Sequence, residues 1–144
     1  MKKYLYISFA LAIFLVASAE KSFACSCLVS LESQKKQIQN AFTGSDAIFS
    51  GEVVEIKQPS ADEYDVLVTF KVAKSWKGNV SREVTIKTAK DSAMCGYGFE
   101  VGKKYLVYAS GIKENLSTTN CSRTTVFSPK GDVKYLDKLK RQKK

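Results

Sequence analysis

Residues 64–76 read YDVLVTFKVAKSW and form the clearest strand pattern in the chain. Apolar side chains occupy every second position, interrupted only by Lys74, and polar side chains fill most positions between them. Alternation with period two places successive side chains on opposite faces of a strand. The pattern therefore predicts one long strand whose buried face carries Tyr64, Val66, Val68, Phe70, Val72 and Trp76.

Further strands are predicted on both sides of this one. The segments are rich in β-branched and aromatic residues and are separated by turn residues; they are 47–56, 82–88 and 103–109, with shorter candidates at 112–116 and 124–127. Gly51 lies inside the first of them, and a glycine within a strand often marks a bulge or a tight bend. Several strands joined by turns are typical of a β-sandwich or a small barrel.

Two short helices flank the predicted strands. In Leu31–Phe42 the apolar positions Leu31, Ile38, Ala41 and Phe42 suit a helix that ends near Gly44. Residues 133–139 carry Val133, Leu136 and Leu139 at intervals of three, and we expect a short helix that frays into a basic tail. The fold class is therefore all-β with flanking short helices, as one domain over 25–130 followed by a C-terminal helix and tail over 131–144.

The first 24 residues have the features of a signal peptide. Lys2 and Lys3 precede an apolar stretch over residues 4–16, which is short for a membrane span, and small residues follow. Cleavage fits after Ala19 and equally after Ala24. Lipidation of Cys25 ranks behind both, because the usual Leu three positions earlier is missing and three thiols would remain. We expect an exported protein of the periplasm or the extracellular space.

The composition narrows the chemistry that the chain can perform. The 144 residues carry a net charge of +9 and include no His, which excludes His-based catalytic triads and His-ligated zinc. The four Cys residues, Cys25, Cys27, Cys95 and Cys121, do not have zinc-ribbon spacing. We therefore expect no enzyme and no cofactor, and we expect two disulfides because the chain is exported.

Cys25 and Cys27 are separated by one residue, so on an extended chain their side chains point the same way. Each is then expected to bond to a distant partner. Two connectivities remain: Cys25–Cys95 with Cys27–Cys121, or the crossed arrangement. Either one pins residues 25–27 to the domain, and cleavage after Ala24 would leave a free α-amine in a fixed position.

Five segments, taken in register, carry a family resemblance. The first is Cys25-Ser26-Cys27. The other four, in chain order, are Ala41-Phe42 with Ser45-Asp46, the strand that ends in Trp76-Lys77-Gly78, Met94-Cys95-Gly96-Tyr97, and Thr118-Thr119-Asn120-Cys121-Ser122. Together they resemble the N-terminal, netrin-like module of the tissue inhibitors of metalloproteinases, a family that starts with Cys-x-Cys. The chain differs from the family at two places. Thr43 stands where the family has a third cysteine, and Leu28-Val29-Ser30 stands where the family usually has prolines.

The resemblance implies a five-stranded barrel of the oligonucleotide/oligosaccharide-binding type, with the pairs Cys25–Cys95 and Cys27–Cys121. It also implies a protease-binding ridge. The α-amine and carbonyl oxygen of Cys25 would coordinate the zinc of a metalloprotease, and the side chain of Ser26 would enter the specificity pocket. Cys27, Leu28 and Val29 would make edge contacts, with Ala93 and Met94 beside them.

The leading hypothesis is therefore an exported protein-binding domain that inhibits a zinc metalloprotease through Cys25. The alternative is an envelope-associated or extracellular structural or adhesion module of the same fold without inhibitory activity. A third hypothesis is binding to an anionic envelope surface or polyanion through a basic tail composed of Lys138, Lys140, Arg141, Lys143 and Lys144. We expect a monomer and no nucleic-acid partner.

Overall fold

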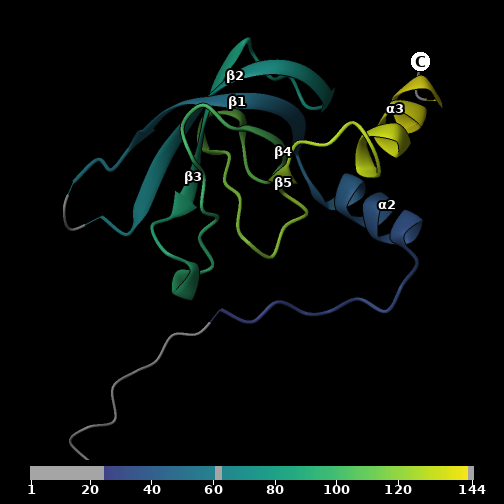
Figure 1. Ribbon diagram of the computed structural model, residues 1–144, viewed down its shortest axis with the longest axis horizontal. Helices are drawn as coiled ribbons and strands as arrows, with labels where there is room; N and C mark the ends of the chain where they lie inside the picture. Colours follow the sequence, from purple (N-terminus) through teal and green to yellow (C-terminus); the bar gives the residue numbers. More distant parts are fainter. Residues whose placement is uncertain (1–24, 61–62, 143–144) are drawn as a thin grey trace, which may run out of the picture.

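The computed structural model describes residues 25–60 and 63–142 (Figure 1). The predicted signal peptide, both candidate cleavage sites, Lys143 and Lys144 lie outside the described residues. The helices are α2 (Gln34–Gly44) and α3 (Asp132–Gln142), with the short 3-10 helices η1 (Ser92–Met94) and η2 (Lys113–Asn115). The strands are β1 (Ala47–Lys57), β2 (Asp65–Lys77), β3 (Glu83–Ala89), β4 (Lys104–Ala109) and β5 (Thr125–Val126).

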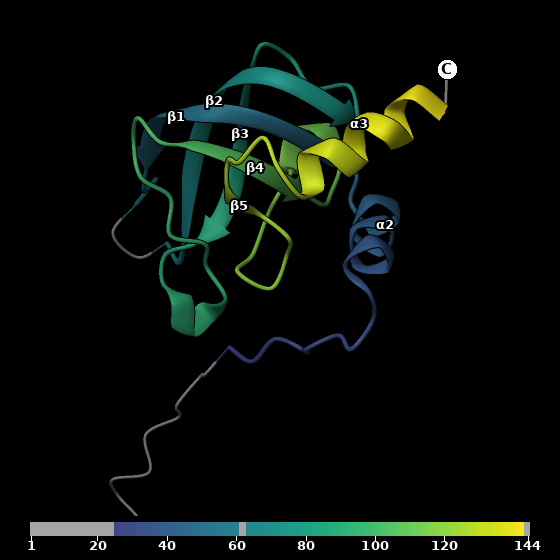
Figure 2. The same ribbon diagram turned by 45° about the vertical axis from the view of Figure 1, so that its right-hand side comes forward.

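The chain is mostly β, as predicted, and the five strands form one antiparallel sheet in the order β3-β2-β1-β4-β5. The sheet is curved but is not closed into a barrel (Figure 2). Among the described residues, β3 and β5 are its two edges, and single bridges join Ser117 to Lys87 and to Ser110. The expected barrel is therefore replaced by an open sheet, because β5 has only two residues with which to pair.

Irregular pairing between β1 and β2 changes which face Trp76 occupies. Val72 lies opposite Gly51 while Lys74 lies opposite Ser50, so Ala73 is an extra residue in β2. The bulge predicted at Gly51 is thus confirmed, although the inserted residue belongs to the partner strand. Each extra residue reverses the alternation beyond it. The prediction that Trp76 shares a face with Val68 is therefore wrong. Tyr64, also predicted on the buried face, precedes β2 and is exposed.

The two faces of the sheet bury two separate apolar clusters. One face packs Phe49, Val68, Phe70, Ile86, Tyr105 and Val107 with four smaller or more peripheral neighbours. The other face, which α2 and α3 cover, packs Ile38, Phe42, Ile48, Trp76, Leu106, Tyr108, Val133 and Leu136. Successive residues of β4 alternate between the clusters, as the period of a strand requires. Each face of the sheet therefore buries an apolar cluster of its own.

Helix α2 begins later in the chain than its sequence pattern predicted. Ile38 and Phe42 are buried and the helix ends at Gly44, as expected, but its first residue is Gln34. Leu31 is fully exposed and belongs to an irregular segment. Leu31 is seven residues before Ile38, and no apolar residue lies between them. The apolar spacing from Ile38 to Phe42 is therefore satisfied by a helix that begins after Leu31.

The segment 112–116, expected to be a short strand, is instead the 3-10 helix η2 and its flanks. Leu116 still becomes buried, because the chain turns back and its carbonyl oxygen accepts a hydrogen bond from Lys87 N at 2.8 Å. The predicted strand at 124–127 is confirmed in a shortened form as β5.

Helix α3 is part of the folded body. Leu136 is fully buried and Val133 nearly so. The carboxylate of Asp137 accepts hydrogen bonds from the indole Nε1 of Trp76 at 2.5 Å and from Lys74 Nζ at 2.6 Å. These bonds hold the helix against β2, so it continues through Lys140 and Arg141 to Gln142 instead of fraying after Leu139.

Replacing Asp137 with Asn is expected to make the free energy of unfolding less dependent on pH in the acid range. The hydrogen bond from Lys74, followed by that from Trp76, lowers the pKa of Asp137. Its stabilisation is therefore complete above the unfolded pKa of about 3.9 and is lost as the pH falls through the lower folded pKa. Denaturant unfolding should show that Asp137→Asn costs about 1 kcal/mol at neutral pH and less at acid pH.

The matched control is Glu114→Gln, which removes an exposed carboxylate from η2 without touching α3. This control should change the free energy of unfolding little at either pH. If the cost of Asp137→Asn were the same at both pH values, its charge would play no part in holding α3.

Candidate functional site

The structure contains two disulfides, Cys25–Cys95 and Cys27–Cys121, which are the pairs that the family resemblance implies. Their Cα atoms are 5.0 Å and 5.2 Å apart, within the usual range for disulfides. The two bonds lie side by side, because Cys25 Sγ is 3.6 Å from Cys121 Sγ. Two disulfides indicate an oxidising compartment outside the cytoplasm.

Cys95 is presented by a tight loop between β3 and β4. It directly follows η1 and adopts a left-handed backbone conformation, with φ of 63°. Before it, the side chain of Asp91 caps η1 by accepting a hydrogen bond from Met94 N at 3.1 Å. The main-chain oxygen of Asp91 also accepts a bond from Gly96 N at 2.9 Å. The loop is therefore fixed on both sides of the cysteine.

Cys121 is held by a network of hydroxyl groups under β4. Thr118 Oγ1 donates to Tyr108 O and lies 2.8 Å from Thr124 Oγ1 and 2.9 Å from Ser122 Oγ. Both threonines are buried. In addition, Asn120 N donates to Cys95 O at 2.9 Å. The two segments that receive the N-terminal cysteines are thus bonded to each other as well as to the sheet.

The N-terminal strap, residues 25–33, runs from these disulfides to the start of α2 (Figure 1). Among the described residues, positions 25–32 form no main-chain to main-chain hydrogen bond. The disulfides hold one end of the strap. At the other end Gln37 Nε2 donates to Ser30 O at 3.3 Å and to Glu32 O at 2.7 Å. The strap is thus an extended segment fixed at both ends.

The strap exposes apolar side chains to solvent. Leu28 and Leu31 are fully exposed and Val29 is 88% exposed. Ser26 and Cys27 are exposed too, while Cys25 is half-buried. The predicted ridge residues Ala93 and Met94 lie in η1, next to Cys95, and are thereby joined covalently to the first residue of the strap. Contiguous exposed apolar side chains are uncommon on monomeric proteins and often mark interaction sites.

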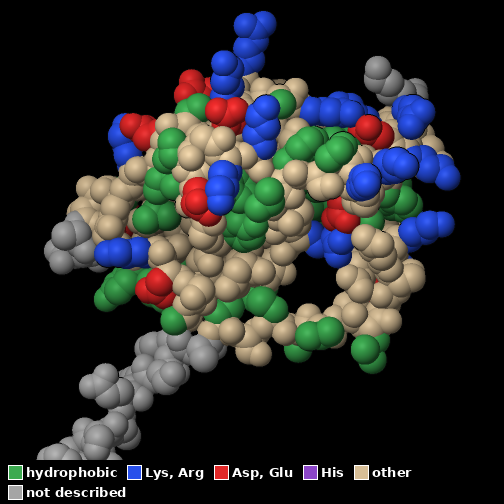
Figure 3. Space-filling view, in the orientation of Figure 1, with side chains coloured by type: hydrophobic (Ala, Val, Ile, Leu, Met, Phe, Trp, Pro, Cys, Tyr) green, Lys and Arg blue, Asp and Glu red, His purple; other side chains and the backbone are tan. Residues whose placement is uncertain are grey.

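A polar hollow of about 580 Å³ lies beneath the strap (Figure 3). The strap contributes Leu28, Ser30 and Glu32 to its walls. The body contributes Gln37, Asn40, Cys121, Ser122, Arg123, Thr125 and Asp132. The strap therefore does not pack its full length against the sheet, and both of its sides contact space that solvent can fill.

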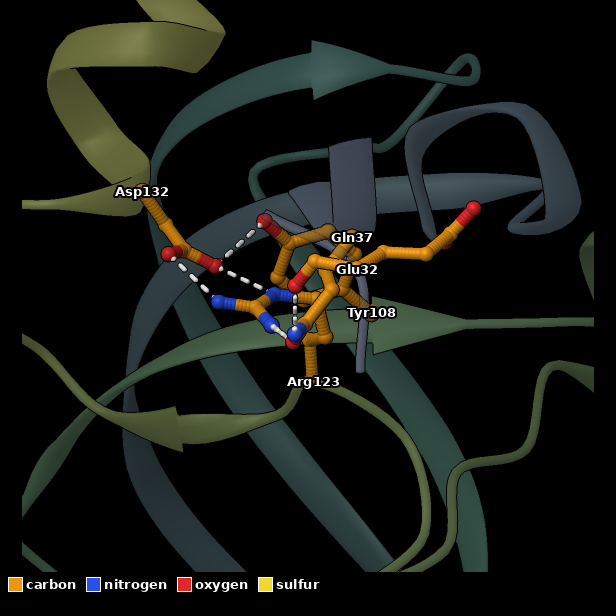
Figure 4. Close-up of polar contacts among 5 residues, drawn as sticks. All are labelled: Glu32, Gln37, Tyr108, Arg123 and Asp132. Atoms are coloured by element: carbon orange, nitrogen blue, oxygen red, sulfur yellow. Dashed lines mark hydrogen bonds and ion pairs between the residues drawn. The ribbon is translucent and has the colours of Figure 1, made fainter. Parts of the chain in front are cut away.

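The floor of this hollow is a closed set of polar contacts (Figure 4). Arg123 donates two hydrogen bonds to the carboxylate of Asp132, both at 2.8 Å, and a third to Gln37 Oε1 at 3.1 Å. Tyr108 OH donates to Asp132 at 3.0 Å. Burial, followed by the negative charge of Asp132, raises the pKa of Tyr108, so the phenol remains protonated. The network is structural, because its charges are already paired.

The sequence did not reveal this network. Gln37 and Arg123 are 86 positions apart, and no local spacing connects them. The hydrogen bond of Tyr108 to Asp132 also spans β4 and α3. Only the tertiary arrangement brings these residues together under the strap.

The four cysteines are not available as metal ligands in the described structure. The Sγ atoms of Cys25, Cys27 and Cys121 lie within 4.8 Å of one another, a spacing that a metal ion accepts. Each of them is nevertheless bonded to another sulfur, so no thiolate is present. None of the described helices is both long and apolar enough to cross a membrane.

Comparison with known proteins identifies no relative for this chain: no family model matches the sequence, and no curated protein is significantly similar to it. The resemblance to the tissue inhibitors of metalloproteinases therefore stays a prediction.

Proposed function

We propose that this protein is an exported protein-binding domain that inhibits a zinc metalloprotease through its N-terminal strap. The observation that carries the proposal is the combination of covalent fixation and exposure. Two disulfides immobilise Cys25 and Cys27, while Leu28 and Val29 beside them remain almost fully exposed. A segment that is already rigid loses little conformational entropy when a partner binds it.

The chemistry of a free Cys25 α-amine suits a metal partner. An α-amine has a pKa near 7.7, so about one sixth of it is neutral and able to donate a lone pair at pH 7. A catalytic zinc keeps one coordination position open for water or substrate. In the proposed complex the amine and the Cys25 carbonyl oxygen displace that water. The side chain of Ser26 enters the specificity pocket, and Leu28 and Val29 contact the edge of the cleft.

Adding a single Ala before Cys25 is the test of this mechanism. The mature chain that begins at Cys25 should inhibit a zinc endopeptidase, and the Ala-extended chain should lose at least 100-fold in affinity because the amine is now an amide. Both proteins should show the same disulfides and the same thermal melting. Equal inhibition by the two chains would exclude coordination by the amine, and so would an exported protein that begins at Glu20.

A pair of substitutions tests the apolar part of the strap separately. Leu28→Ser with Val29→Ser should weaken inhibition, since both side chains are offered to the partner. The control Tyr64→Ser removes an exposed aromatic at the β1–β2 hairpin, where Tyr64 is 73% exposed, and should leave inhibition unchanged. In a structural or adhesion module of the same fold, partner binding would depend on Leu28 and Val29 but would survive the Ala extension.

A further inference from the structure

The two helices form a strongly positive surface. Helices α2 and α3 together carry six cationic and two acidic side chains, a net charge of +4. Figure 3 shows lysine and arginine side chains gathered over α3. In Figures 1 and 2 the helix pair lies at the opposite end of the strap from η1, which Cys95 directly follows. This surface is therefore separate from the proposed protease-binding ridge.

Both acidic side chains of the helix pair are occupied within the molecule. Asp132 binds Arg123 and Tyr108, and Asp137 binds Trp76 and Lys74. They therefore do not neutralise the lysines on the outer side of the helices. Within the described part of the chain, four exposed lysines of these helices have no hydrogen bond or ion pair of their side chains: Lys35, Lys36, Lys134 and Lys138.

The start of α2 is unfavourable for the helix itself. Its first turn contains Lys35 and Lys36 and no acidic residue, and Ser33 makes no capping hydrogen bond with its side chain. Positive charges near a helix N-terminus oppose the helix dipole. Residues that disfavour the local structure, and that make no compensating contact within the fold, are expected at functional sites.

Lysines of both helices converge on one groove. A depression of about 350 Å³ between α2 and α3 is lined by Lys35, Lys134 and Lys138, together with Gln34, Ile38, Gly131 and Tyr135. The groove contains no acidic side chain. Three lysines line this groove without an acidic partner in its lining, so an anion bound there would reduce the repulsion between their charges.

We propose that the α2–α3 surface docks the protein on the phosphate groups of an anionic lipid bilayer. The lysines are distributed over two adjacent helices, so their charges act together on an extended anionic surface. Half-buried Tyr135 and Leu139 lie among them in α3, and tyrosine is favoured at the interface between a membrane and water. In the proposed contact the lysine stems would cover apolar surface while their ammonium groups reach the phosphates.

The experiment is sedimentation of the mature protein with lipid vesicles. Binding is expected with vesicles of phosphatidylcholine and phosphatidylglycerol in low salt, little binding with phosphatidylcholine alone, and release by high salt. The variant Lys134→Glu with Lys138→Glu should bind the mixed vesicles at least tenfold less well. The variant Lys134→Arg with Lys138→Arg should retain binding.

The matched control is Arg82→Glu with Lys90→Glu, which changes the net charge equally at two exposed residues outside the helices. Thermal melting of each variant verifies that it is folded. An equal loss of binding in this control, or no loss in the Lys134 and Lys138 variant, overturns the proposal. Binding to soluble heparin or polyphosphate without binding to the anionic vesicles also overturns it, and assigns the surface to a soluble polyanion.

Discussion

Replacing Cys27 and Cys121 together with Ser is expected to lower the free energy of unfolding by about 3.5 kcal/mol. While Cys25–Cys95 is intact, the Cys27–Cys121 bond closes a path that runs through Cys25–Cys95 and spans only about 28 residues. Cross-linking distant residues removes conformations from the unfolded chain, so the chain loses less conformational entropy when it folds. Without the bond, the unfolded chain regains those conformations and folding becomes less favourable. The total stability of a small domain is about 5 to 15 kcal/mol, so this variant should be close to its unfolding threshold at 37 °C. Equilibrium denaturation in urea measures the change.

The second disulfide supplies a matched comparison. While Cys27–Cys121 is intact, Cys25–Cys95 closes the same path through residues 25–27 and 95–121, so the entropic effect of removing it should be the same. Near-equal losses would identify restriction of the unfolded chain as the source of stability. A much larger loss for one pair would show that native packing around that pair dominates. Either loss below about 1 kcal/mol would contradict the entropic account.

Replacing Gly96 with Ala is expected to destabilise the protein by more than about 3 kcal/mol, at the upper end of the usual cost of overpacking. A Cβ at this position would overlap the carbonyl oxygen of Ala89 and lie 2.7 Å from the main-chain oxygen of Asp91. Both atoms belong to backbone, so neither can move aside as a flexible side chain does. Because Gly96 follows Cys95, the displacement would also disturb the attachment of the strap.

Gly98 is the control for that substitution. A Cβ there meets no atom within 4 Å, and Gly98 lies only two residues further along the same loop. Gly98→Ala should leave the thermal melting temperature almost unchanged. If both substitutions had the same small effect, the close approach of Gly96 to the end of β3 would not be a constraint on the fold.

Local periodicity predicted the strands well because alternation is a property of a few neighbouring residues. The β2 pattern over residues 64–76 located the strand to within one residue at each end. It could not locate the extra residue Ala73, because a bulge depends on how β2 pairs with β1. That single insertion moved Trp76 to the helix-covered face, where it binds Asp137.

In the candidate site, too, the sequence predicted only the features that depend on neighbouring residues. The spacing of Cys25 and Cys27 indicated that both side chains reach the body of the domain, and the exposure of residues 28 and 29 agrees with a ridge. Closure of the sheet into a barrel and the Arg123–Asp132 network depend on distant pairings. No pattern within a short stretch of sequence encodes them.

The strap has a further property that matters for any protein that contacts a protease. A cut between Leu28 and Val29 would add one water molecule to the chain but release no peptide, because Cys25 and Cys27 stay bonded to Cys95 and Cys121. The nicked N-terminal fragment would remain in place, with its new carboxyl end beside the partner. Limited proteolysis within the strap would therefore leave the protein in one covalent piece. Because the two new ends stay close together, re-formation of the cut peptide bond would compete with dissociation of the partner.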